Sequence, residues 1–176
     1  MIDEGLFRAT GIVKALMTFS FKGTSTLYKS DIHEIIENTL LFLNFKIPED
    51  AKIKRDFQLK TEIPLFVDKM HQVLIYILDN AIFEFNSENR KDGVITIITR
   101  ENEESAVLTI SNNGKPIPEQ YLDQIFDPFF TTKDPGKGVG LGLSISYALI
   151  NEQNGKIRVE NSNDGVSFII ELPLNK

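Results

Sequence analysis

The densest chemical signal is a run of four glycines in residues 136–142, which read Gly-Lys-Gly-Val-Gly-Leu-Gly. Glycine tolerates positive φ and leaves no side chain between backbone N–H groups and a ligand. A helix predicted to begin near Leu141 adds the positive end of its dipole, so the segment could cradle an anion such as phosphate. A flexible hinge would have the same composition. The Gly-Lys-Ser/Thr ending of a P-loop is absent.

A second chemical candidate is an asparagine within a long apolar helix predicted over residues 66–85. Gln72, Tyr76, Asn80 and Glu84 recur at every fourth position, which places them in one stripe of that helix. A polar amide in a buried stretch needs a partner. Asn80 is therefore either a hydrogen-bonded structural residue or a ligand of Mg²⁺, a cation that takes few protein oxygens beside phosphate and water.

The elements that would position these residues follow from hydrophobic periodicity and turn signals. The pattern predicts a two-layer α/β sandwich of the α+β class, with helices on one face of a mixed, mostly antiparallel sheet. An N-cap at Ser30 or Asp31 opens one helix, and Pro48 ends it. The remaining predicted elements are helices at 6–21, 66–85 and 141–153, a linker at 22–29, a strand at 52–59, and hairpins at 93–111 and 156–172, the latter turning at Asn163-Asp164-Gly165.

Composition narrows the functional classes. The 176 residues suit one domain with a short appendage, and the absence of cysteine excludes disulfides, thiolate zinc sites and cysteine nucleophiles. A net charge of -6 and a pI near 5.0 argue against a nucleic-acid binder. No stretch reaches the roughly 18 apolar residues of a membrane helix. We therefore expect a soluble chain that makes no contact with nucleic acid or membrane.

Several motifs resemble one known family. Residues 125–133 read IFDPFFTTK, and GKGVGLGLSI follows; together they resemble the F box and second glycine box of sensor histidine kinases. Residues 72–81 resemble the N box of that family, 110–118 its first glycine box, and 165–173 its closing strand. The resemblance covers about residues 6–174. It implies the catalytic, ATP-binding domain of a two-component sensor histidine kinase, with the Bergerat-type fold of the GHKL ATPases.

The resemblance also implies roles for individual residues. Asn80 would hold Mg²⁺, Asn112 would accept the amino hydrogen of adenine, and Lys133 would act with Asn80 in catalysis. The implied ATP-binding residues are Tyr76, Asn80, Glu84, Asn112, Gly114, Ile117, Phe130, Thr131, Thr132, Lys133, Lys137, Gly138, Val139, Gly140, Leu141 and Gly142.

Four positions depart from the family pattern. Tyr76 replaces a frequent asparagine, Phe83 a frequent lysine or arginine, Asn112 the adenine-binding aspartate, and Pro116 a glycine. A neutral acceptor at Asn112 forgoes a charge-assisted hydrogen bond, of order 1 kcal/mol. These departures keep open an alternative: a degenerate pseudokinase that binds only nucleotide or a partner. An ATPase or serine kinase of the same fold, such as an anti-sigma factor kinase, would lack the F box.

The resemblance divides the chain into three parts: the end of a dimerisation hairpin helix at 1–22, a linker at 23–30, and the catalytic domain at 31–176. The two histidines, His33 and His71, are predicted to be helix-surface residues rather than phosphoacceptors. The acceptor should precede residue 12, so the chain alone is expected to bind ATP without efficient autophosphorylation. The implied partners are the phosphoacceptor helix and a response regulator. The implied location is the cytoplasm, including the cytoplasmic part of a membrane-bound sensor.

Overall fold

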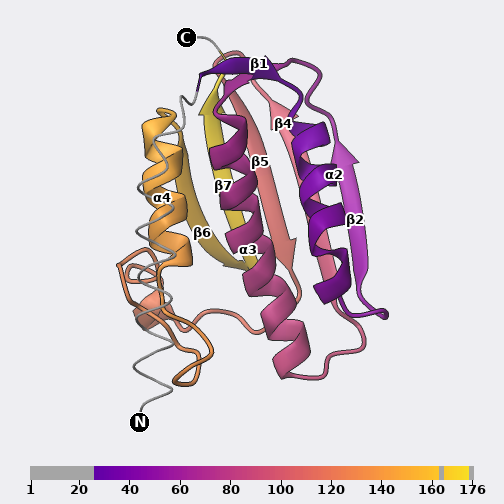
Figure 1. The fold of residues 1–176 in the computed structure, drawn as a ribbon, viewed down its shortest axis with the longest axis vertical. Coiled ribbons are helices and arrows are strands. Elements are labelled where there is room, and N and C mark those ends of the chain that lie inside the picture. The colour runs from indigo at the N-terminus through magenta and orange to yellow at the C-terminus, as the bar shows by residue number, and fades with distance from the viewer. Residues whose placement is uncertain (1–25, 163–164, 175–176) are drawn as a thin grey trace.

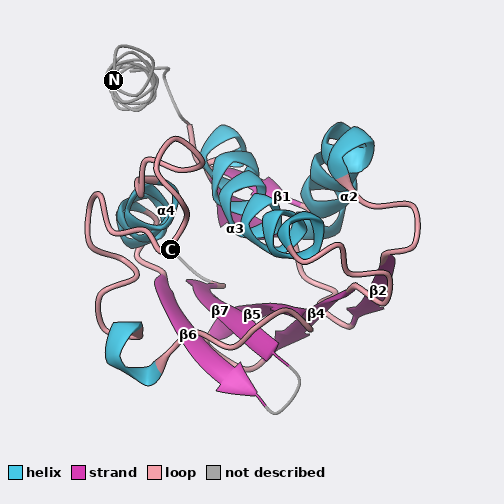
Figure 2. Cartoon of the chain, turned by 90° about the horizontal axis from the view of Figure 1, so that it is seen from below, coloured by secondary structure: helices cyan, strands magenta, loops and turns pink. Residues whose placement is uncertain are grey.

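A computed structural model of the chain describes residues 26–162 and 165–174. Three helices, α2 (Ile32–Leu43), α3 (Val67–Ser87) and α4 (Gly142–Glu152), cover one face of a five-stranded sheet in the described part (Figures 1 and 2). The predicted α+β sandwich is therefore confirmed. The helix and chain segment expected before residue 23 lie outside the described residues.

The sheet has the strand order β2-β4-β5-β7-β6, comprising β2 (Lys52–Phe57), β4 (Val94–Glu101), β5 (Ser105–Asn112), β7 (Gly165–Pro173) and β6 (Lys156–Ser162). β2 and β4 pair in parallel, whereas the other neighbours are antiparallel. Parallel pairing requires a long crossover, and α3 lies within the connection from β2 to β4. Both predicted hairpins, β4–β5 and β6–β7, are confirmed.

A second, two-stranded sheet was not predicted. Tyr28–Ser30 (β1) pairs antiparallel with Ile63–Leu65 (β3), so three residues of the expected linker are a strand. Pro64 is the middle residue of β3 and lies opposite Lys29. Each strand of a two-stranded ribbon is an edge, where a residue without an N–H is tolerated.

Local signals account for α2. The Asp31 side chain accepts the backbone N–H of His33 at 2.8 Å, which is an N-cap, and a 3-10 turn at Asn44–Lys46 follows the helix before Pro48. The predicted apolar face of α2 is buried, as is that of α3, at Ile32, Ile35, Ile36, Leu40, Leu43, Val73, Leu74, Ile77, Leu78 and Ala81. No helix of the described part is long and apolar enough to cross a membrane.

Both histidines lie on helices, as predicted, but each is partly buried and has a partner on another element. The His33 ring stacks on Phe57 with 4.3 Å between ring centroids, and its Nε2 lies 2.8 Å from Thr99 Oγ1. His71 Nδ1 lies 2.8 Å from Thr39 Oγ1, which joins α3 to α2. Each ring packs between its own helix and the element that carries its threonine partner, so both histidines are partly buried.

Candidate nucleotide site

The polar stripe of α3 meets the loop that precedes the glycine-rich segment at Asn80. The Asn80 side chain is partly buried, and its Oδ1 accepts a hydrogen bond of 2.9 Å from Lys133 Nζ. The same ammonium group lies 4.1 Å from the centroid of the Phe83 ring. The side chain of Lys133 therefore reaches from the loop to helix α3, and the structure brings together the two residues that the sequence singled out for catalysis.

The surroundings of this ammonium group are mixed in polarity. Burial lowers the pKa of Lys133 below its ordinary value, and the charges of Asp79 and Glu84 partly oppose that effect. Lys46 also disfavours the charged form, although its Nζ is 2.6 Å from Asp79 Oδ1. Asn80 Oδ1 and the nearby carboxylates are oxygen donors, the ligand type that Mg²⁺ takes.

Tyr76 fills the space between α3 and the start of α4. Its hydroxyl accepts a hydrogen bond of 3.1 Å from Gln72 Nε2, one turn earlier on α3. Its ring lies against Gly142, where a Cβ atom would be 3.1 Å from Tyr76 Cδ1. The tyrosine that replaces the family's asparagine therefore packs against the predicted phosphate-binding segment.

A second cluster forms where β5 ends. Asn112 Oδ1 accepts the backbone N–H of Gly114 at 2.9 Å. A Cβ atom at the buried Gly114 would be 2.7 Å from both Asn112 Oδ1 and Glu84 Cγ. Only glycine lets this turn approach α3 so closely. The amide oxygen of Asn112 has a second lone pair, which leaves it able to accept one further hydrogen bond.

The loop after this cluster is braced by an asparagine that sequence analysis missed. The backbone N–H of Ile117 donates to Asn161 Oδ1 at 3.0 Å, and Asn161 Nδ2 donates to the Ile117 carbonyl at 2.6 Å. Asn161 lies on β6, 44 positions further along the chain. The sequence shows it only as a polar residue in a strand, so no local signal could have identified it.

The segment 129–141, called the lid from here on, is closed at its two ends. The Phe129 N–H donates to the Gly140 carbonyl at 2.8 Å. Gly140 has φ 73°, and a Cβ atom there would be 2.5 Å from the Phe129 carbonyl carbon and the Phe130 oxygen. The Phe130 ring packs 5.3 Å from that of Tyr121. Glycine at 140 is thus required both by its backbone conformation and by close contact.

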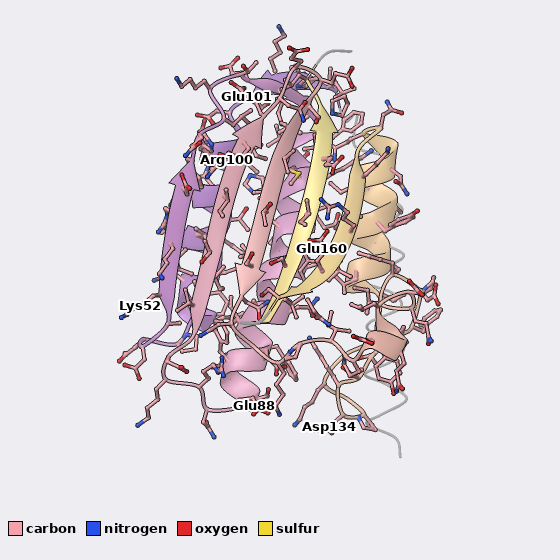
Figure 3. The ribbon with its side chains drawn as sticks, turned by 180° about the vertical axis from the view of Figure 1, so that it is seen from behind. Lys52, Glu88, Arg100, Glu101, Asp134 and Glu160 are labelled. Atoms are coloured by element: carbon pink, nitrogen blue, oxygen red, sulfur yellow. The ribbon has the colours of Figure 1, made fainter. Side chains whose placement is uncertain are left out.

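The middle of the lid is exposed. Thr131, Thr132 and Lys137 are open to solvent, and Lys137 Nζ pairs with Asp134 Oδ2 at 2.8 Å. The hydrogen bond from Lys137 holds the pKa of Asp134 below its ordinary value. Asp134 lies at the same end of the molecule as Glu88, just beyond the end of α3 (Figure 3). The Lys133 side chain reaches the body of the domain, whereas those of Thr131, Thr132 and Lys137 do not.

Helix α4 begins directly after the lid without a side-chain cap. Leu141 is the N-cap residue and makes no side-chain hydrogen bond. The hydroxyl of Ser144 donates to the Leu141 carbonyl at 3.0 Å instead of accepting an N–H. The first N–H groups of a helix have no partner within it, so they are donors for an anion at this position.

Comparisons with known proteins identify the family. Residues 67–176 match the family described as histidine kinase-, DNA gyrase B- and HSP90-like ATPases. Sporulation kinase C of Bacillus subtilis (strain 168) is 32% identical over 145 residues, which are 82% of this chain but 30% of that kinase. The chain thus spans about a third of this curated relative.

Solved structures give the same result. The nucleotide-free catalytic domain of histidine kinase ThkA matches with a TM-score of 0.76 and 31% identity, covering 85% of this chain and 99% of that one. ThkA in complex with the response regulator TrrA matches with a TM-score of 0.75 and 30% identity, covering 97% of this chain and 48% of that one. The chain belongs to the histidine kinase-, DNA gyrase B- and HSP90-like ATPase family, as an ATP-binding catalytic domain of the histidine kinase type.

Proposed function

We propose that this domain binds ATP with Mg²⁺ and transfers the γ-phosphoryl group to a histidine on a dimerisation helix of the full-length kinase. The observation that carries the proposal is the hydrogen bond from the Lys133 ammonium group to the Asn80 amide oxygen, where α3 faces the lid. Phosphoryl transfer needs little covalent chemistry from the protein, because positioning and charge neutralisation do most of the work.

Each part of the site has one task in this proposal. Asn112 Oδ1 accepts the adenine amino hydrogen on its free lone pair, and Gly114 keeps the space beside it open. Asn80 would hold the magnesium ion, which would supply positive charge to the phosphates. The lid and the uncapped N-terminus of α4 donate N–H groups to the phosphates, while Lys133 and Lys137 add positive charge.

The remaining assignments concern the whole kinase. We infer that residues 1–22 belong to the dimerisation hairpin, 23–30 to a linker and 31–176 to the catalytic domain. The phosphoacceptor lies outside this chain, because His33 and His71 are held in internal contacts. A response regulator is the expected partner, supported by the ThkA–TrrA complex. The cytoplasm is the expected location.

Calorimetry tests the nucleotide site. ATP and the non-hydrolysable analogue AMPPNP are titrated with and without Mg²⁺ into the wild type, Asn80→Ala and the control Asn38→Ala, whose side chain is exposed on α2. We expect magnesium-dependent binding that Asn80→Ala abolishes and Asn38→Ala retains. A folded wild type that binds no nucleotide would contradict the proposal and favour the pseudokinase reading.

A second assay tests the transfer step. The chain is mixed with labelled ATP and a separate dimerisation hairpin that carries an acceptor histidine. Phosphohistidine should form on the hairpin and not on the chain alone. Nucleotide binding without any transfer to the hairpin would again favour a pseudokinase.

A further inference from the structure

The contact between Lys133 and α3 has a feature that the proposed function does not use. The ammonium group lies between Asn80 Oδ1, at 2.9 Å, and the face of the Phe83 ring, at 4.1 Å. An aromatic face attracts a cation through its quadrupole, most strongly where water is partly excluded. The lysine is therefore held from two sides while no nucleotide is bound.

The charges around this position suit one cation. Asp79 and Glu84 both favour the charged form of Lys133, although Asp79 already pairs with Lys46 at 2.6 Å. Phe83, Asp79 and Lys46 also line a hollow of about 410 Å³ on the same side of α3. The surface of α3 beside Asn80 thus provides an amide oxygen and a π face in contact with the Lys133 ammonium group, and Asp79 and Glu84 favour its charge.

Mg²⁺ and this ammonium group would compete for the same amide oxygen. A magnesium ion bound to Asn80 would lie about 2.1 Å from Oδ1, the oxygen from which Lys133 Nζ is 2.9 Å away. Two positive charges would then be a few ångströms apart in a partly desolvated place, where their repulsion is weakly screened. Each cation therefore weakens the binding of the other at Asn80.

We propose that Lys133 is a built-in counter-cation that occupies the metal position of Asn80 in the empty domain, with the Phe83 ring as its resting place. The incoming magnesium–nucleotide complex displaces it, and the ammonium group moves to the phosphate oxygens. Because Lys133 is part of the lid, metal binding and lid movement become one event. The inference rests on the proposed function and adds the order of its steps.

Nuclear magnetic resonance of protein labelled with ¹³C at lysine Cε tests this exchange. The ring current of Phe83 should shift the Lys133 Cε protons upfield in the empty domain. Lys133→Arg assigns the signal, and Phe83→Leu should remove the shift. Lys69 is the matched control, because its Nζ lies 4.2 Å from the centroid of the Phe66 ring near the other end of α3, where it pairs with Glu152.

Mg²⁺ with AMPPNP should move the Lys133 signal out of the ring-current position, whereas Mg²⁺ alone should not. An unchanged Lys133 signal in a domain shown to bind the nucleotide would overturn the counter-cation and leave the proposed function standing. An absent upfield shift in the empty domain would also overturn it. Failure of the nucleotide to bind would overturn both the counter-cation role and the proposed function.

Affinity gives an independent readout. Phe83→Leu weakens the resting place, so the Kd for AMPPNP with Mg²⁺ should fall about two- to fivefold, the range of an exposed cation–π contact. Phe45→Leu is the control, because Phe45 lines the same hollow and is 77% exposed. Weaker binding by Phe83→Leu than by Phe45→Leu would contradict a resting role for the ring.

Discussion

The two sides of the nucleotide site are built differently. At the end of β5, Asn112 and Gly114 are joined by a hydrogen bond, and Asn161 braces the following loop from both of its amide atoms. The lid is clasped where Phe129 meets Gly140, and between these ends the Lys133 side chain reaches α3. The side formed by Asn112, Gly114 and Asn161, called the wall from here on, is part of the folded body. The lid is attached to that body at only a few points.

This difference assigns recognition of the base to the wall and closure over the phosphates to the lid. A wall fixed by hydrogen bonds on both flanks can hold a hydrogen-bond acceptor in place for a base, because its geometry is set before the ligand arrives. A lid held by few contacts can rearrange at low cost when charged phosphates bind. Substitutions in the wall should therefore affect stability or base choice, whereas substitutions in the lid should affect affinity.

The largest effect is expected for Gly165→Ala, at the start of β7, where the chain passes closely beside Asn112. Gly165 has φ 137°, and a Cβ atom there would overlap the backbone carbonyl oxygen of Asn112. We expect a loss of roughly 3 kcal/mol or more in the free energy of unfolding, because β7 must move away from β5. Urea denaturation followed by circular dichroism measures this loss.

Gly93→Ala is the control for that substitution. Its Cβ would be 2.8 Å from Phe85 Cδ2, a side-chain atom that can shift. We expect it to cost about 1–2 kcal/mol, as overpacking does. If Gly165→Ala costs no more than Gly93→Ala, the wall is less rigid than we describe.

Gly140→Ala should break the lid without unfolding the domain. The new methyl group would collide with the Phe129–Phe130 backbone and open the clasp. We expect AMPPNP affinity to fall about tenfold or more, or ~1.4 kcal/mol, with a smaller change in unfolding free energy. Gly136→Ala is the control, since Gly136 also has positive φ but no atom within 4 Å of its Cβ position. Equal losses of affinity in both variants would show that backbone strain, and not the clasp, matters.

Asn112→Asp should strengthen the wall's grip on adenine. A carboxylate at this position can still accept the Gly114 N–H and offers a charged acceptor to the adenine amino group. We expect ATP to bind about fivefold tighter, a gain of about 1 kcal/mol. Calorimetry with GTP is the control, because guanine presents a carbonyl oxygen there. A gain of equal size for GTP would mean that the carboxylate does not act through the adenine amino group.

The smallest effect is a difference in acid titration between two exposed ion pairs. Hydrogen bonds from Arg100 and Lys137 hold the pKa values of Asp56, on the sheet, and Asp134, in the lid, below their ordinary range. A lowered pKa means that each pair stabilises its surroundings above the unfolded pKa and loses that contribution as pH falls through the folded pKa.

Carboxyl resonances recorded against pH test this pair of sites. On binding of AMPPNP with Mg²⁺, the pKa of Asp134 should rise towards its ordinary value as Lys137 turns to phosphate. Asp56 should titrate as before. A constant pKa at Asp134 would show that Lys137 stays with Asp134 and does not reach the nucleotide.

Much of this architecture could be predicted because its signals are local. The N-cap at Asp31, the alternation in β4 and β5, and the apolar face of α3 each depend on residues a few positions apart. The same holds for Asn80, whose place in the polar stripe follows from helical spacing alone.

What could not be predicted depends on long-range register. The pairing of β1 with β3 joins two three-residue segments, and neither carries a pattern of its own. From the sequence, Phe83 is interpreted as the loss of a positive charge. In the structure its ring lies against the ammonium group of Lys133, which also binds Asn80, 53 positions away in the sequence. Periodicity gives the face on which a side chain lies, but not the residue that arrives opposite it.

The composition of the outermost strands has a consequence for behaviour at high concentration. In the described residues the five-stranded sheet ends at β2 and β6, which carry Lys52, Lys54, Lys156 and Arg158 as exposed side chains. A strand from another copy added at either margin would set like charges side by side. Lysines at such margins are a common protection against runaway strand addition. The domain should therefore resist fibrillar self-association with or without its nucleotide.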